Sequence, residues 1–321
     1  VARRLNGPVL MYGMPAAGSF SVMHIYLPPH PGPVAASEFF GADIGLILLF
    51  GLLIAIPTWY VSGYRWGLYL GNDFKVTDVL LGPQQDDENA LKNPASPGTV
   101  IALMLIPMLL IFGNTGLKTL ASAGTIDGDA GWVQLFVFLG QTSIALLITT
   151  VVTMIVLGLR RGMDKASVEK LMEGALGPIC SVVLITGAGG MFGGVLRTSG
   201  IGDALADSLS NVGIPVILAC YLISVALRLA QGSATVALTT AAALMAPAVE
   251  AADFSAVQLA LIVLATAAGS VFGSHVNDSG FWLVGRLMGM DVATTLRTWT
   301  INQIMVSAIG FALVLVCYGL A

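Results

Sequence analysis

Residues 264–284 read LATAAGSVFGSHVNDSGFWLV, an apolar segment that a polar cluster interrupts at its centre. The cluster comprises His275, Asn277, Asp278 and Ser279. An ionisable side chain inside a membrane costs at least about 2.5 kcal/mol on insertion scales. Polar, helix-breaking backbone is tolerated at that depth where it lines a cavity. In a membrane protein this segment therefore indicates a broken helix with a substrate or proton site at the break, and a polar helix cap is the alternative.

The composition of the whole chain places it in a lipid bilayer. Of its 321 residues, 56% are hydrophobic and 10% are charged, against about 25% charged residues in soluble domains. The mean hydropathy is +0.87 and the isoelectric point is about 5.2. These values exclude a soluble enzyme, a disordered chain and a nucleic-acid-binding protein, and the continuous apolar stretches disfavour a β-barrel. The sequence predicts an all-α polytopic membrane protein.

Apolar stretches long enough to span the hydrocarbon, about 20 residues, recur along the chain. The candidates are 44–61, 99–117, 132–159, 175–196, 212–230, 255–272 and 300–320, with shorter apolar stretches at 16–26 and 232–249. One long polar stretch, 63–98, separates the first part from the rest. We expect it to be a linker loop and not a domain.

The positions of Lys and Arg predict the topology, because cytoplasmic loops are enriched in both. One assignment places all but three of the 14 Lys and Arg residues on the cytoplasmic side. These basic segments are the N-terminus, the 63–98 loop, the 160–174 loop and 286–298. The exceptions are Lys118, Arg197 and Arg228. The C-terminus then lies outside.

An internal repeat joins the two ends of the chain. Residues 16–19 and 267–270 both read AAGS, and a histidine follows each after four residues, at positions 24 and 275. Further on, Gly32, Gly41 and Asp43 match Gly280, Gly289 and Asp291 in the same order. With the predicted topology the two copies run in opposite directions through the membrane. Inverted repeats with broken helices are typical of secondary transporters, whose sites lie at the breaks.

The first copy carries its own break, in the sequence PPHPGP at 28–33. We interpret His24 and His30 as the site residues that correspond to the cluster around His275. A Pro-rich turn with a purely structural role is the alternative.

A second polar cluster, RLAQGSAT at 228–235, lies between two apolar stretches without a charged loop. It is either the tip of a re-entrant hairpin over 212–249 or a short turn between two spans. At a hairpin tip, Gln231, Gly232, Ser233 and Thr235 would face a ligand, and Arg228 would bind an anion, in a bidentate manner if the anion is a carboxylate. Alternatively, Arg228 extends to the membrane interface.

Other patterns point to packing and not to chemistry. The run GAGGMFGG at 187–194 lacks the third glycine of a dinucleotide-binding fingerprint and has no βαβ context. Its spacing of small residues fits close helix packing. The sequence contains no zinc-ligand spacing, P-loop or Ser–His–Asp order, and we expect no cofactor and no metal.

Four segments together resemble the gluconate permease family of gluconate:proton symporters. They are HIYLPPHPGP at 24–33, GAGGMFGGV at 187–195, QGSAT at 231–235 and SHVNDSGFW at 274–282. The resemblance implies a bacterial inner-membrane symporter for gluconate or a similar small sugar acid, within the wider ion-transporter superfamily of inverted repeats and re-entrant hairpins. Family members are longer, so the comparison predicts that the first spans and the first hairpin are missing. Residues 1–62 would end the first repeat, and 99–321 would form the second, with its hairpin at 212–249, broken helix at 255–288 and last span at 300–320.

These observations predict proton-coupled uptake of gluconate or a similar monocarboxylate. Arg228 and the 231–235 tip would hold the substrate, 275–279 would close the site, and His275 and Asp278 would be the proton carriers, because both can titrate near neutral pH. A D-serine or other organic-acid symporter of the same family, an intramembrane enzyme and an inactive fragment remain alternatives. A homo-oligomer is possible.

Overall fold

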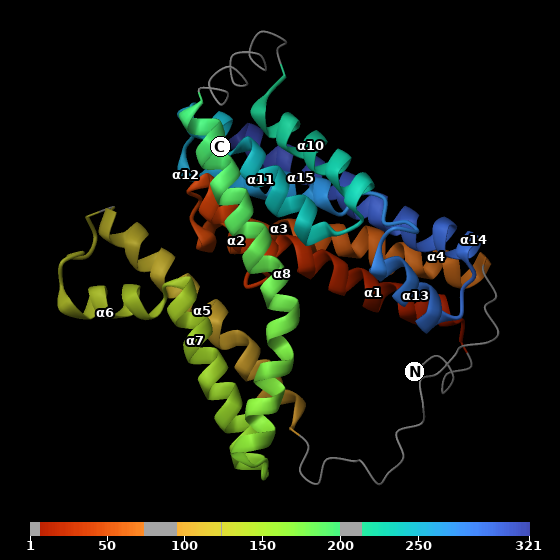
Figure 1. The fold of residues 1–321 in the computed structure, drawn as a ribbon, viewed down its shortest axis with the longest axis horizontal. Coiled ribbons are helices and arrows are strands. Elements are labelled where there is room, and N and C mark those ends of the chain that lie inside the picture. Colours follow the sequence, from red (N-terminus) through yellow and green to blue (C-terminus); the bar gives the residue numbers. More distant parts are fainter. Residues whose placement is uncertain (1–6, 74–94, 123, 200–213) are drawn as a thin grey trace. The chain divides into compact units, whose positions relative to one another are not determined.

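The structure, a computed structural model, describes residues 7–73, 95–122, 124–199 and 214–321. The regular structure in these ranges is helical, as the sequence predicts for an all-α protein (Figure 1). The chain divides into two compact units. The first unit combines Val1–Gly82 with Leu184–Ala321, and the second is Pro83–Val183.

The first unit contains two interrupted helices, a helical hairpin and two long helices. Its elements are α1 (Val9–Tyr26), α2 (Pro31–Phe40), α3 (Ile44–Trp59), η1 (Tyr60–Arg65), α4 (Trp66–Asp73), α10 (Val216–Gln231), α11 (Ala234–Glu250), α12 (Ala256–Ser270), α13 (Ser279–Met288), α14 (Val292–Thr295), η5 (Leu296–Thr300) and α15 (Ile301–Leu320). The segments η1 and η5 are π-helical and continuous with their neighbours. Two of the resulting rods, Ile44–Gly71 and Val292–Leu320, are long and apolar enough to cross a membrane.

The helix that begins at Ile44 is longer than the sequence suggests. We expected residues 63–98 to be a loop, but η1 and α4 continue the helix to Asp73. Glycines at positions 63, 67 and 71 allow this extension to pack along α1, and Trp66 packs against the buried cluster that contains Leu10 and Met14 of α1. Residues 74–94 of the expected loop lie outside the described residues.

The two interrupted helices have the same local design. The short helices α2 and α13 each contain 10 residues. The N-cap side chain accepts a hydrogen bond from the amide of the glycine two residues on, from Gly32 to His30 and from Gly280 to Asp278. Each ends at a left-handed glycine, Gly41 or Gly289, which is followed two residues later by a capping aspartate, Asp43 or Asp291. The residues that match in the sequence therefore have matching roles as caps.

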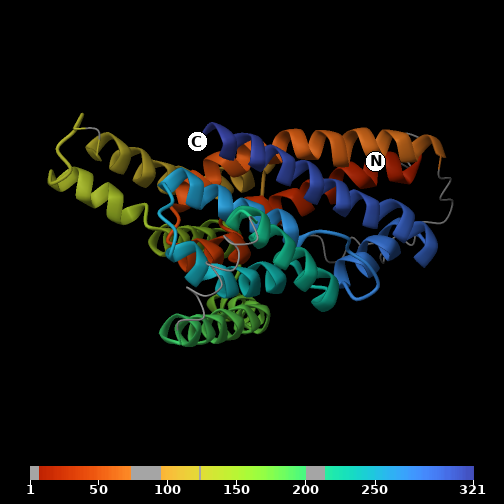
Figure 2. The same cartoon turned by 90° about the horizontal axis from the view of Figure 1, so that it is seen from above.

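Glycines allow α1 to approach the rod α3–η1–α4 closely (Figure 2). They recur every fourth residue at Gly63, Gly67 and Gly71. A Cβ atom at Gly18 would lie 3.0 Å from the Cα of Gly63, and one at Gly67 would lie 2.6 Å from the Cδ of Pro15. Such contacts are the small-residue packing that associates helices in membranes.

The hairpin consists of α10 and α11, which pack against each other and against α12 and α2. They contain 16 and 17 residues and are shorter than the helices that qualify as membrane spans. Gly232 ends α10 in the left-handed region, with φ 79°, and Ser233 caps α11 by accepting a hydrogen bond from the amide of Val236. The hairpin thus turns within two residues.

The second unit contains α5 (Pro97–Ser122), α6 (Gly131–Leu139), α7 (Thr142–Thr153), η3 (Met154–Gly158), η4 (Leu159–Arg161) and the first part of α8 (Lys165–Thr198). Pro97–Lys118 and Thr142–Arg161 are long and apolar enough to span a membrane. The glycine-rich run at 187–194 lies in the part of α8 that belongs to the first unit. It is helical, but Gly187 is exposed and has no neighbouring atom within 4 Å of its Cβ position, so the expected packing role stays a prediction.

The expected single span over 132–159 is interrupted. Helix α6 ends at Gly140, and α7 begins at Thr142. The interruption arises because the backbone at Gly140 packs directly on α5, where a Cβ atom would collide with the carbonyl oxygen of Leu110. Asn114 of α5 also donates a hydrogen bond of 2.5 Å to the carbonyl of Val137. The candidate span in this region therefore begins at Thr142.

Close packing along α1 can be tested at Gly67. In the variant Gly67→Leu the new side chain would overlap Pro15, and overpacking of this kind costs about 1–3 kcal/mol. We expect a lower midpoint in thermal unfolding of the detergent-solubilised protein. Gly319→Leu in α15 is the matched control, because no described atom lies within 4 Å of its Cβ position. Equal midpoints for the two variants would contradict this packing.

Candidate functional site

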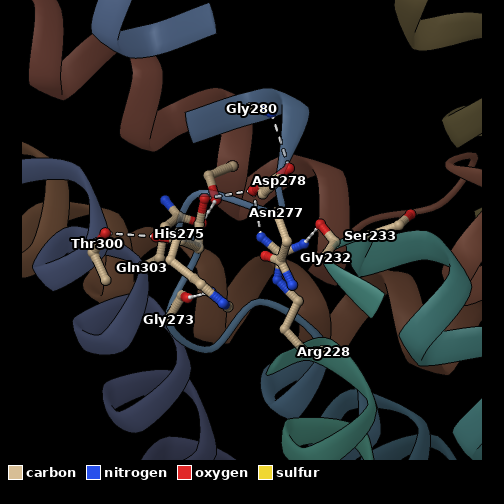
Figure 3. Close-up of polar contacts among 12 residues, drawn as sticks. Arg228, Gly232, Ser233, Gly273, His275, Asn277, Asp278, Gly280, Thr300 and Gln303 are labelled. Carbon is tan, nitrogen blue, oxygen red and sulfur yellow. Dashed lines mark hydrogen bonds and ion pairs between the residues drawn. The ribbon is translucent and has the colours of Figure 1, made fainter. Parts of the chain in front are cut away.

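The tip of the α10–α11 hairpin meets the break between α12 and α13 (Figure 3). The side chain of Asn277 donates a hydrogen bond of 2.9 Å to the carbonyl of Leu229, near the end of α10. At Gly232 the two backbones are so close that any Cβ atom would collide with the carbonyl of Asn277. Glycine is therefore required at this position both by its positive φ and by the contact.

A buried ion pair joins the two elements at this junction. The Nη2 of Arg228 lies 2.5 Å from the Oδ2 of Asp278, and their side chains are 4% and 14% exposed. Asp278 also caps α13 through the amide of Gly280, at 2.9 Å, and accepts a hydrogen bond from the hydroxyl of Ser274. Ser274 in turn accepts one of 3.0 Å from the indole of Trp299. The carboxylate is thus held by three groups from two elements, and Ser274 connects it to the π-helical segment η5.

The three nitrogen atoms of the Arg228 guanidinium differ in their hydrogen bonding. Its Nη1 donates to the carbonyl of Gly232 and its Nη2 donates to Asp278. Its Nε is buried and has no hydrogen-bond partner among the described residues. Because Nε and Nη2 share one edge of the guanidinium, that edge could receive both oxygens of a carboxylate if Asp278 released it.

A cavity of about 660 Å³ lies beside the ion pair. Its lining comes from α1, the hairpin tip, the second break, α13 and the start of α15. The polar side chains among the lining residues are Ser21, His24, Arg228, Ser233, Thr235, Asp278, Ser279, Trp299 and Gln303. The volume is within the usual range of small-molecule sites, about 300–1,000 Å³. An arginine, a carboxylate and several hydroxyls around such a cavity suit a small hydroxylated anion.

His24 connects the first interrupted helix to the hairpin. Its Nε2 is 3.3 Å from the hydroxyl of Thr235, and its ring lies 3.9 Å from that of His30, centroid to centroid. The Nδ1 of His30 accepts a hydrogen bond from the amide of Gly32. That nitrogen must be unprotonated to cap α2, so His30 has a structural role in this arrangement, whereas His24 faces the cavity.

The residues singled out by the sequence divide into two groups. Those that line the cavity are His24, Arg228, Ser233, Thr235, Asp278 and Ser279. Those outside the lining are His30 at the start of α2, and Gln231, Gly232, His275 and Asn277 at the hairpin tip and the second break. The Nδ1 of His275 lies 2.9 Å from the carbonyl of Gly273, within its own loop. Gly232 and Asn277 hold the two backbones together.

Sequence reasoning missed Ser21 and Gln303, which both line the cavity. Gln303 and the adjacent Asn302 lie in the apolar stretch that we interpreted only as the last span. Two adjacent carboxamides in such a stretch are costly unless they are hydrogen-bonded, and this was the available signal. The sequence contained no such signal for Ser21, because single serines are common in membrane helices.

Comparison with known families matches residues 1–319 to the model described as GntP family permease. The chain belongs to this family of permeases. It is 36% identical over 318 residues to a gluconate permease of Pseudomonas aeruginosa, covering 98% of this chain and 69% of the relative. It is 34% identical over 313 residues to a low-affinity gluconate transporter of Escherichia coli, covering 97% of this chain and 67% of the relative.

A third relative is named for a different sugar acid. The Gnt-II system L-idonate transporter of E. coli is 34% identical over 304 residues, covering 94% of this chain and 67% of the relative. The GntP family membership that the four sequence segments predicted is therefore confirmed. With the apolar helices, it makes this chain a membrane protein of the permease type, and a transporter in preference to an enzyme.

The buried ion pair can be tested by a double-mutant cycle. Removing one partner of a fully buried pair costs about 3–5 kcal/mol. The Asp278 carboxylate is 14% exposed and keeps its bonds to Ser274 and Gly280, so a cost of about 1–3 kcal/mol is expected here. We expect Arg228→Met to lower the free energy of unfolding by that order, and Arg228→Met combined with Asp278→Asn to recover a large part of the loss. Asparagine at 278 keeps the cap of α13. Strictly additive losses in denaturant unfolding would contradict the pairing.

Proposed function

We propose that the protein is a proton-coupled symporter that imports gluconate or a similar small sugar-acid monocarboxylate. The names of its relatives support this substrate class. The observation that carries the proposal is the buried pair of Arg228 and Asp278 at the edge of the cavity. The guanidinium of Arg228, which is paired with the carboxylate of Asp278, could pair with the carboxylate of a substrate instead.

The substrate carboxylate would replace Asp278 on Arg228. The unpartnered Nε and the Nη2 of Arg228 together offer a bidentate edge. The hydroxyls of Ser233, Thr235 and Ser279, which line the same cavity, would bind hydroxyl groups of the substrate. His24 would contribute from α1, where it already contacts Thr235.

Proton coupling follows from charge balance at this pair. An anionic substrate beside ionised Asp278 would place two negative charges on one arginine, whereas protonation of Asp278 removes one of them. Proton and substrate would then enter together and leave together. Of the two proton carriers expected from the sequence, Asp278 is the one on the cavity, and His275 is outside its lining.

In alternating access, the two interrupted helices would be the corresponding elements of two inverted repeats, one in each repeat. Their matching caps support a common origin. A helix of 16 or 17 residues is about 24–26 Å long, less than the roughly 30 Å of hydrocarbon. This favours a re-entrant hairpin for α10–α11 rather than two membrane spans.

We place the protein in the bacterial inner membrane, with its basic loops in the cytoplasm and its C-terminus outside.

The variant Asp278→Asn tests the coupling. Because asparagine mimics the protonated acid, we expect gluconate binding that no longer depends on pH. Exchange of labelled for unlabelled gluconate across proteoliposomes should continue, and accumulation driven by a pH gradient should be lost. Asp291→Asn is the matched control, because Asp291 also caps a helix, α14, but is outside the cavity lining.

Two results would decide against this assignment. Full pH-driven accumulation by Asp278→Asn would exclude Asp278 as the proton carrier. Loss of accumulation in His275→Gln, with Asp278→Asn unaffected, would transfer the role to His275.

Uptake of labelled substrate distinguishes transport from the other activities. We expect gluconate to be recovered unchanged inside vesicles, whereas an intramembrane enzyme would convert it. Competition by idonate, glycerate and D-serine should be strongest for the sugar acids. Stronger inhibition by D-serine would assign the protein to the alternative substrate. Absence of any binding or uptake would favour an inactive fragment.

A further inference from the structure

A chain of three side chains connects the cavity to the π-helical segment η1. Ser21 of α1 donates a hydrogen bond of 2.7 Å to the Oε1 of Gln303. The Nε2 of Gln303 donates one of 2.8 Å to the Oδ1 of Asn302, and the Nδ2 of Asn302 donates one of 2.6 Å to the backbone carbonyl of Ser62. Asn302 and Gln303 are 0% and 2% exposed. The chain therefore lies in the interior and reaches the cavity at Ser21 and Gln303.

The carbonyl of Ser62 determines the direction of every hydrogen bond in this chain. A carbonyl can only accept, so Asn302 must turn its amino group toward Ser62 and its oxygen toward Gln303. Gln303 must then present its amino group to Asn302 and its oxygen to Ser21. Reversing any one amide would place two donors or two acceptors against each other. The hydroxyl hydrogen of Ser21 is consequently committed to Gln303.

Because the hydroxyl hydrogen of Ser21 is used in the bond to Gln303, the hydrogen-bonding role of Ser21 toward a ligand in the cavity is fixed. With its hydrogen directed at Gln303, the Ser21 oxygen presents only lone pairs, so it is an acceptor toward the cavity. The Gln303 amide has two N–H donors, and one of them is hydrogen-bonded to Asn302. A neighbouring acceptor and donor match a ligand hydroxyl, which can donate to one and accept from the other.

Close helix packing supports this chain. The Cβ position of Gly18 is 3.0 Å from the Cα of Gly63 and 3.5 Å from the Nδ2 of Asn302. Gly18 and Ser21 lie on the same helix, α1, three residues apart, and hence on the same face. The absence of a side chain at Gly18 brings α1 near enough for Ser21 to reach Gln303.

We propose that Ser21 and Gln303 form a subsite for the hydroxylated chain of the substrate. Ser21 accepts a hydrogen bond from one hydroxyl of a polyhydroxy acid, while Arg228 holds the carboxylate. This inference rests on the proposed function and adds to it the residues that distinguish a sugar acid from an acid with fewer hydroxyls.

The test is competition between labelled gluconate and its analogues that each lack one hydroxyl, on the detergent-purified protein. The wild type should bind at least one analogue about fivefold more weakly, since a neutral hydrogen bond contributes about 1 kcal/mol. In Ser21→Ala gluconate itself should bind about fivefold more weakly, and the discrimination against that analogue should disappear. If Ser21 had a purely structural role, Ser21→Ala would weaken the binding of gluconate and of every analogue by the same factor.

Ser19→Ala is the matched control on the same helix. Ser19 is partly exposed, donates to the carbonyl of Ala16 in its own helix and is not among the cavity-lining residues. We expect it to bind gluconate and every analogue as the wild type does. Gln303→Met removes the partner that orients Ser21 and should also reduce the discrimination.

The outcomes separate the subsite from the proposed function. If Ser21→Ala discriminates among the analogues with the wild-type ratios, while Arg228→Met abolishes gluconate binding, the subsite is wrong and the proposed function stands. If the wild type does not bind gluconate, the proposed function fails and the subsite fails with it.

Discussion

The site depends on one buried ion pair, between Arg228 and Asp278. Asp278 caps α13, and Arg228 bonds the hairpin turn at Gly232. Each charged group therefore stabilises the end of its own element while it pairs with the other. Because two charges away from water are costly unless they are paired, the hairpin tip and the helix break have a strong physical reason to stay together. In the proposed mechanism, the proton binds to Asp278 of this pair and the substrate carboxylate binds to Arg228.

Small residues make this arrangement possible. The contact at Gly232 brings the backbone of the hairpin onto that of the break, and Gly18 with Gly63 brings α1 onto the rod α3–η1–α4. At such distances polar side chains of different helices reach each other without water. The hydrogen bonds from Ser21 through Gln303 to Asn302, and from Asn302 to Ser62, follow from this packing. Ser21 and Gln303 therefore line the cavity with donor and acceptor roles that are determined before a ligand enters.

Much of the fold was predictable from local patterns. Composition predicted the helical membrane architecture, and the polar interruption after Ser270 marked the break between α12 and α13. The repeated glycines and aspartates correspond to helix caps that recur at Gly41 and Gly289. The end of α6 at Gly140 and the extension of α3 to Asp73 were not predictable. Both depend on contacts with other helices, and the hydropathy of a single segment contains no information about such contacts.

The sequence alone determined that this is a membrane protein of a permease family and that Arg228 and Asp278 are candidate site residues. Their rarity in apolar sequence is a local property with a known energetic cost. Only the tertiary structure decided which of them meet. It paired Arg228 with Asp278, placed His275 outside the cavity lining, and brought Ser21 and Gln303, 282 positions apart, into contact. Such pairings arise from helix packing between distant segments, and no periodicity within a single segment encodes them.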